Sequence, residues 1–321
     1  ERPIDLAAID LRAQELAAAL PGGTIDSIWT SAGAANRFDI FLQATPPAEG
    51  EVVRVDGSGA VLRIRRDGER WARGGYVDTL VRLHQSLFAG ERGRLVVGTS
   101  GLLLLVTAVA GLLIAWPRRG GWRRALWPGR PAAEAGRMYA WHRALGLWWA
   151  APALLLVSAG VLLAFDATVE RWLDPAPVDP PELSMPAGGE PAIGMAAAVE
   201  RALARFPGAV LSGIGYPTAE SAWWAVRLRQ PAEPRRAYGK TRVFVSAVDG
   251  ETLVAFDALA APASRRFVDA LFAIHTGEAG GRIGRLLALS VGLGWLSLGL
   301  FGWRLWRARR ALQRSARQPL S

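Results

Sequence analysis

Long apolar runs dominate the hydrophobic pattern of the chain. Three of them, residues 93–116, 138–165 and 286–303, have the length and composition of membrane spans, if one cation is allowed near the start of the second. At about 1.5 Å per helical residue, roughly 20 apolar residues cross a hydrocarbon core of about 30 Å. The pattern therefore predicts an integral membrane protein with helical spans.

Two long polar segments alternate with these spans and follow the same order of patterns. Residues 6–31 and 192–217 each place apolar residues at helical spacing, followed by a Pro-Gly pair and a β-rich run. The alternating strands RFDIFLQA and AWWAVRLRQ come next, and Asp56-Gly57 and Asp249-Gly250 then mark hairpins. Each polar segment is predicted to fold as one helix on a small antiparallel sheet.

The C-terminal part of the chain repeats the earlier part at a fixed offset of 191 residues. YVDTLVRLHQSLFAGERGR (76–94) corresponds to FVDALFAIHTGEAGGRIGR (267–285). The coinciding positions are Val77/Val268, Asp78/Asp269, Leu80/Leu271, His84/His275, Gly90/Gly281, Gly93/Gly284, Arg94/Arg285, Gly101/Gly292, Gly111/Gly302, Arg118/Arg309 and Arg119/Arg310. One histidine, four glycines and three arginines in register indicate an internal duplication.

The duplication predicts a membrane span that the given sequence lacks. The second copy has the span 138–165 ahead of its polar module, whereas the first copy has none. We therefore expect a further span before residue 1, in a longer product, and a histidine on it equivalent to His142 of YAWHRALGLWW.

The net charge of +10 reflects membrane topology rather than a nucleic-acid footprint. Arginines gather in the loop 117–137 and after the last span, at Arg118, Arg119, Arg123, Arg124, Arg130, Arg137, Arg304, Arg307, Arg309, Arg310, Arg314 and Arg317. The polar segments 1–80 and 166–269 carry slightly more acids than bases. The positive-inside rule then places the loop and the C-terminus in the cytoplasm and both polar segments outside.

Several kinds of chemistry are excluded by the composition. The chain has no cysteine, which excludes iron–sulfur clusters, thiolate zinc sites, thiol catalysis and disulfides. It also lacks a P-loop and the HExxH and GxSxG motifs. The three histidines, His84, His142 and His275, are left as the candidates for a functional site.

The order of these elements, with LHQSLFAG, IHTGEAGGRIGR, WHRALGLWW and the VDGSGAV and VDGETLV hairpins, resembles the PepSY-associated transmembrane family. That family includes iron-regulated membrane proteins and ferric-siderophore reductases of the bacterial inner membrane, and the resemblance covers essentially the whole chain. It implies a four-helix transmembrane bundle with two small α+β PepSY-like modules on the extracytoplasmic side. In the reductase members it also implies b-type haems held between histidines of the helices.

The resemblance and the repeat together predict seven segments. They are a first PepSY-like module (1–75), an interfacial His segment with a transmembrane helix (76–119), a cytoplasmic basic loop (120–136), a transmembrane helix (137–166), a second PepSY-like module (167–266), a second His segment with its helix (267–310) and a basic cytoplasmic tail (311–321).

The histidines are predicted to be axial ligands of one or two haem b groups, because a neutral imidazole binds iron while its other N–H is oriented by an acceptor. About a pseudo-two-fold axis, His84 and His275 would face each other on the outer side. His142, some four residues into its span, would pair on the cytoplasmic side with the histidine of the preceding span. The plainer alternative for each histidine is an interfacial anchor or a hydrogen-bonded packing residue.

Neighbouring repeated residues have predicted roles as well. Arg94 and Arg285 could pair with haem propionates, although snorkelling anchors explain them equally well. Asp78 and Asp269 are interpreted as helix-start carboxylates. Residues 76–88 are expected to form a separate interfacial helix, ended by Gly90 and Gly93.

The leading functional hypothesis is a membrane-embedded haem oxidoreductase that passes electrons to an extracytoplasmic ferric chelate such as a ferric siderophore. The donor would be a cytoplasmic donor, a quinone or a protein partner. The alternative is a non-catalytic membrane protein whose PepSY modules bind a partner or restrain a peptidase. A transporter fits less well, because the spans have no acidic residue in their middles.

The cross-repeat hypothesis predicts that His84→Ala and His275→Ala each remove the same haem and spare the other. Each variant deletes one of two ligands to one iron, so the reduced-minus-oxidised visible spectra of the two variants should match. Loss of different haems would contradict the pairing.

Overall fold

The computed structural model describes residues 4–31, 36–46, 48–66, 75–118, 120–129, 134–175, 178–186, 188–234 and 237–315. Parts of the predicted first module (67–74), basic loop (130–133) and tail (316–321), with Arg119, Arg130 and Arg317, lie outside the described residues. The chain divides into two compact units, one of residues 1–88 and 170–270 and one of residues 89–169 and 271–321.

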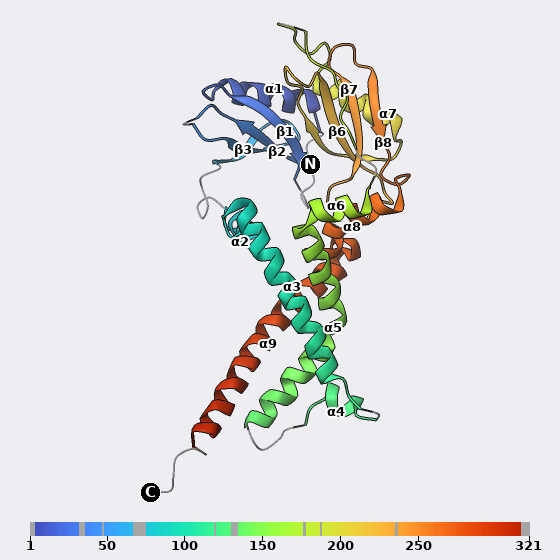
Figure 1. Cartoon of the computed structure of the whole chain (residues 1–321). Helices are drawn as coiled ribbons and strands as arrows, with labels where there is room; N and C mark the ends of the chain where they lie inside the picture. Colours follow the sequence, from blue (N-terminus) through green and yellow to red (C-terminus); the bar gives the residue numbers. More distant parts are fainter. Residues whose placement is uncertain are drawn as a thin grey trace. The chain divides into compact units, whose positions relative to one another are not determined.

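The first unit contains two halves with the same order of elements, one helix and then four strands (Figure 1). The first half is α1 (Leu6–Ala18), β1 (Thr24–Thr30), β2 (Arg37–Gln43), β3 (Glu51–Asp56) and β4 (Val61–Arg66). The second half is α7 (Met195–Arg205), β5 (Val210–Gly215), β6 (Trp223–Arg229), β7 (Thr241–Ser246) and β8 (Thr252–Phe256).

The two predicted hairpins are confirmed. β3 pairs with β4, and Asp56 shapes their turn because its Oδ1 accepts from the amides of Ser58 and Ala60 at 2.9 and 3.0 Å. β7 pairs with β8 across a turn in which Gly250 has φ of 76°, a left-handed conformation that favours glycine.

One continuous antiparallel sheet, rather than the two small sheets predicted, joins the halves in the order β4-β3-β2-β1-β5-β6-β7-β8. The joint pairs Ser27 with Gly215, Ile28 with Ile214 and Trp29 with Gly213. In an isolated half, the outer edge of the first strand would have unpaired main-chain amides and carbonyls. In the joined sheet these two edges form hydrogen bonds with each other.

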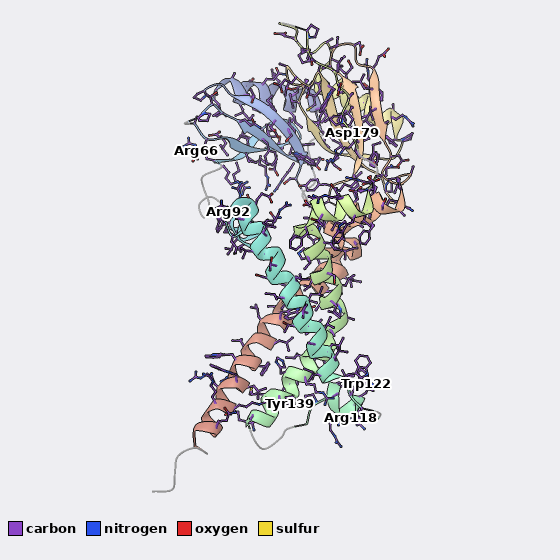
Figure 2. All side chains as sticks on the ribbon, viewed as in Figure 1. Arg66, Arg92, Arg118, Trp122, Tyr139 and Asp179 are labelled. Atoms are coloured by element: carbon purple, nitrogen blue, oxygen red, sulfur yellow. The ribbon has the colours of Figure 1, made fainter. Side chains whose placement is uncertain are left out.

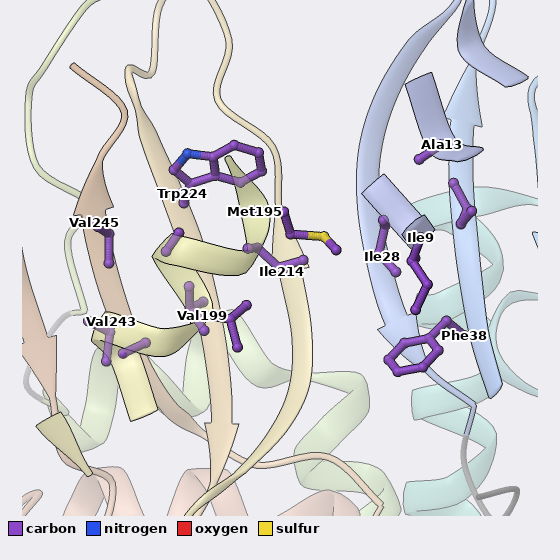
Figure 3. Close-up of a cluster of buried hydrophobic side chains, with 14 of the residues drawn as sticks. Ile9, Ala13, Ile28, Phe38, Met195, Val199, Ile214, Trp224, Val243 and Val245 are labelled. Carbon is purple, nitrogen blue, oxygen red and sulfur yellow. The ribbon is translucent and has the colours of Figure 1, made fainter. Parts of the chain in front are cut away.

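The hydrophobic core lies on the one face of this sheet that α1 and α7 cover (Figure 3). Alternate strand residues point to it, as the period of a β-strand requires. Ile9 and Ala13 of α1 pack with Ile28 and Phe38, and Met195 and Val199 of α7 pack with Ile214, Trp224 and Val243.

Asp10 links the two halves within this core. Its Oδ1 accepts from the Tyr216 hydroxyl at 2.6 Å, and its Oδ2 accepts from the Met195 amide at 3.3 Å. The carboxylate of α1 therefore satisfies an amide at the start of α7. Burial and the hydrogen bond to Asp10 raise the pKa of Tyr216 far above its ordinary value, which keeps the phenol a donor.

Among its described residues, the second unit has three helices long and apolar enough to cross a membrane. They are α3 (Gly90–Ala115), α5 (Glu134–Ala164) and α9 (Gly281–Ser315). α5 packs against both α3 and α9, and it contains Pro152. The short α4 (Trp122–Leu126) precedes α5. α5 begins earlier than the sequence predicted, so His142 lies in its third turn.

Two short helices, α2 (Tyr76–Ser86) and α8 (Ala263–His275), cover the two predicted His segments, and the 3₁₀ turn η1 (Glu278–Gly280) follows α8. A third short helix, α6 (Asp166–Leu173), was not predicted from the sequence. The predicted separation of α2 from its span is confirmed, but the break lies at Leu87, Phe88 and Gly90, with φ of 49°, 60° and 54°. Gly93 lies inside α3 and does not end a helix.

Replacing Gly213 by Ala tests the joint between the halves. A Cβ there would lie 2.6 Å from Cε3 of Trp29, so the indole would have to move, whereas a Cβ at Gly215 would lie 3.4 Å from the Cβ of Ala225. We expect Gly213→Ala to cost about 1–3 kcal/mol through overpacking and to lower the thermal unfolding midpoint in detergent. Gly215→Ala is the matched control and should be close to neutral. Equal midpoints for the two variants would contradict this packing.

Candidate functional site

A cavity of about 400 Å³ lies between the three membrane helices. α3 contributes Thr107 and Gly111, α5 contributes His142, Arg143 and Trp149, and α9 contributes Trp295. Most of the remaining lining is Leu and Ala. A mainly apolar space with a few polar groups directed into it is typical of a site for a cofactor or small ligand.

His142 is the polar centre of this cavity. Its Nδ1 is buried and has no hydrogen-bond partner among the described residues. Glycines leave room near its ring, because Gly111 lines the same cavity and a Cβ at Gly302 would lie 3.5 Å from Cε1 of His142. Gly111 and Gly302 are positions that the predicted repeat places in register. A buried imidazole nitrogen without a partner is uncommon in folded proteins, which makes His142 the first candidate for a functional residue of this cavity.

Arg143 and Trp295 belong to this site and were not singled out from the sequence. The Arg143 Nε donates to the carbonyl of Ala115 at 3.0 Å, which satisfies an acceptor at the end of α3 and holds the guanidinium at the cavity. The Trp295 Nε1 is buried without a partner among the described residues. The one sequence signal for Arg143 is its position next to His142, and Trp295 carries none.

His275 is oriented by the second membrane helix of the same unit. Its Nδ1 lies 2.8 Å from the carbonyl oxygen of Leu156. Because a carbonyl can only accept, Nδ1 carries the proton, and in the neutral ring Nε2 carries the lone pair. The contact depends on Gly160, where a Cβ would lie 2.6 Å from Cε1 of His275.

His84 lies on α2 in the first unit and is exposed. Its proposed pairing with His275, which lies in the second unit, stays a prediction. Asp78, in the first turn of α2, forms an ion pair with Arg65.

Asp269 differs from the interpretation of it as a helix-start carboxylate. It lies in the middle of α8, where it is buried and close to Lys240 Nζ at 3.1 Å and Arg265 Nε at 3.5 Å. The carboxylate of Asp269 is therefore stabilised by two cations rather than by the helix terminus, because a buried carboxylate needs such partners.

The two repeated arginines contact carboxylates of the chain. Arg94 approaches Glu91 at 3.0 Å and Asp166 at 2.8 Å, and Arg285 lies 3.8 Å from Glu278. These contacts hold the first turns of α3 and α9 to their neighbouring segments. The propionate-binding role of both residues stays a prediction.

Comparison with known proteins identifies the family. A family model described as the PepSY-associated TM region matches residues 5–309. The chain belongs to this family. The match takes in the whole eight-stranded sheet, α3, α5 and all of α9 up to residue 309, and it confirms the resemblance drawn from the histidine segments and hairpins. The comparison with curated proteins found no match.

Membership of the PepSY-associated TM family and the three apolar helices support membrane association of the chain. Within this PepSY-associated TM protein, the described structure brings His142 together with Arg143 and Trp295, and His275 together with Leu156 and Gly160. The site residues missed from the sequence therefore lie around a histidine that the sequence did single out.

Replacing Gly160 by Ala tests the orientation of His275. The added Cβ would displace the ring and break its hydrogen bond to Leu156, so the preference for the Nδ1–H tautomer should be lost. Solid-state NMR of protein labelled with ¹⁵N-histidine reports the tautomer directly. Gly146→Ala on the same helix is the matched control, because its Cβ would meet only Leu298, at 4.0 Å. An unchanged tautomer in Gly160→Ala would contradict the assigned role of Gly160.

Proposed function

We propose that this protein binds haem within its membrane helices and passes electrons across the membrane to an extracytoplasmic ferric chelate such as a ferric siderophore. The observation that carries the proposal is the buried, unpartnered Nδ1 of His142 at an apolar cavity between three spans. A haem bound there would supply one-electron chemistry of its iron, while the protein supplies ligation, orientation and insulation from water.

The residues around His142 fit such a group in three respects. The imidazole provides a nitrogen ligand, and the glycines at 111 and 302 leave space on two neighbouring helices. Arg143 brings a guanidinium, which suits bidentate contact with a carboxylate, to the same cavity. Trp149 and Trp295 add flat apolar surface.

His275 and His84 would serve a second group near the other end of the spans. The bond from His275 to the Leu156 carbonyl fixes the tautomer in which Nε2 is the nitrogen able to bind a metal. In the proposal, His84 would be a further ligand of that group, and Arg94 and Arg285 would pair with its carboxylates.

An internal duplication accounts for this two-site arrangement. The two halves of the first unit share the order of one helix and four strands, and the equivalent Gly111 and Gly302 both lie near His142. We infer that the halves are two PepSY-like modules of a duplicated chain.

The charge pattern supports a location in the bacterial inner membrane with both modules outside. Arg118, Trp122 and Tyr139 lie at the end of the helices where α3 stops and α5 starts (Figure 2). This basic, aromatic-rich end fits the cytoplasmic side. Electrons would enter there from a cytoplasmic donor or a quinone.

A visible spectrum of the full-length protein, purified in detergent from cells supplied with haem, tests the proposal. We expect a Soret band, and sharp α and β bands on reduction with dithionite. His142→Ala should lose the haem of the inner site, because the iron loses a ligand there. Trp141→Leu is the matched control, since Trp141 is the neighbouring residue on α5 and is 40% exposed.

The outcomes separate the parts of the proposal. A colourless wild-type protein would refute haem binding altogether. A coloured wild type with an unchanged haem content in His142→Ala would refute the assignment of His142 as a ligand.

A further inference from the structure

A second cavity of about 400 Å³ lies on the first unit, over the joint between β1 and β5. Apart from Ile214, its strand residues alternate with those of the hydrophobic core, so it lies on the face of the sheet that α1 and α7 leave open. Gly215 and Ala225 make its floor, and the Trp29 indole beside them covers Gly213. Two small residues on adjacent strands leave a hollow in the pleated surface, and glycine in a strand often marks close approach of a ligand.

Two indoles in fixed positions border this hollow. Trp29 makes an edge contact with Tyr238 at 5.4 Å between ring centroids, and its Nε1 donates to Ser27 Oγ at 3.1 Å. Trp223 makes an edge contact with Phe244 at 4.9 Å, and its Nε1 donates to the Pro181 carbonyl at 3.0 Å. Both donors are satisfied, so the rings present apolar surface to the space between them.

The charge around the hollow is positive. The guanidinium of Arg227 lies over the Trp29 ring, 5.2 Å from its centroid. Arg242 is a lining residue on β7. Its guanidinium makes no hydrogen bond or ion pair with another described residue. The acid at the rim, Asp26, already accepts from Ser27 and Gln43.

The charge of Arg242 is compensated only in part, because the acid that acts on it, Asp269, also pairs with Lys240 and Arg265. Burial and the neighbouring Arg265 lower the pKa of Arg242, while Asp269 acts in the opposite direction. A partly buried guanidinium beside a like charge is unfavourable unless a negative group joins it.

We propose that this hollow binds a small anionic ligand with a planar ring, of the class of an aromatic carboxylate. The ring would lie on the floor of Gly215 and Ala225, bordered by Trp29 and Trp223, and the negative group would pair with Arg242. The site is independent of haem binding, because every residue that forms it belongs to the first unit.

The ligand class follows from the lining. An anion without a ring would leave the apolar floor and both indoles in contact with water, and a neutral ring would leave the charge of Arg242 only partly compensated. Both parts of the ligand are therefore needed for full affinity.

Titration of the full-length protein in detergent with benzoate, acetate and benzamide tests the proposal. Saturation-transfer NMR follows the ligand, and the three probes carry ring and charge, charge alone and ring alone. We expect benzoate to bind, and acetate and benzamide to bind at least about tenfold more weakly, because each lacks one class of contact.

Two variants locate the site. Arg242→Gln should weaken benzoate binding at least about tenfold, because it removes a charge-assisted hydrogen bond. Ala225→Leu should also weaken it, because the leucine fills the floor while Arg242 stays in place. Arg229→Gln, on the same strand as Arg227 but outside the lining, is the matched control and should bind as the wild type does. Unchanged thermal midpoints would show that the variants fold.

Two results would overturn the proposal. One is equal benzoate affinity in the wild type and in Arg242→Gln, and the other is no benzoate binding by the wild type. Acetate binding as tight as benzoate binding would overturn the requirement for a ring.

Discussion

The antiparallel pairing of β1 with β5 is the interaction on which the architecture of the first unit depends. It converts two four-stranded sheets into one sheet and gives α1 and α7 a single face to cover. A lone four-stranded half would leave its first strand open to pairing with other chains. The small residues at the joint have a second effect, because Gly213 admits the Trp29 indole and Gly215 leaves a hollow beside it on the face that α1 and α7 do not cover.

In the second unit, α5 has the corresponding central place. It packs against both other spans and carries His142, Arg143, Leu156 and Gly160, so the surroundings of two of the three histidines depend on this one helix. The polar side chains that α5 brings to the cavity are few. In a membrane a polar group is costly to bury without a partner, so the buried Nδ1 of His142, which has no hydrogen-bond partner among the described residues, points to a functional role.

Much of this structure could be predicted from the sequence, because local patterns determined it. The spans follow from the length of the apolar runs, and the hairpins from Asp56-Gly57 and Asp249-Gly250. The joint could not be predicted, since the alternation of β1 is the same whether it lies at an edge or in the middle of a sheet. The break before α3 was predicted, but its start at Leu87 and Phe88 could not be, because these are not residues that ordinarily adopt positive φ.

The candidate sites were predictable only in part, for a similar reason. The repeat drew attention to His84 and His275, and the WHR sequence to His142, but their partners are distant along the chain. The Leu156 carbonyl gives no sequence signal at all, and the burial of Asp269 depends on Lys240, which lies in another element. Contacts of this kind are determined by packing rather than by any local pattern.

Pro152 gives α5 a mechanical property that its neighbours lack. Without an amide hydrogen it cannot donate to the carbonyl of Trp148, so the helix is easier to bend at this point. The bend point separates His142 and its cavity from Leu156 and Gly160, which hold His275. A rearrangement around one histidine can thus be absorbed at the proline before it reaches the other, and the two ends of one helix can be tuned independently.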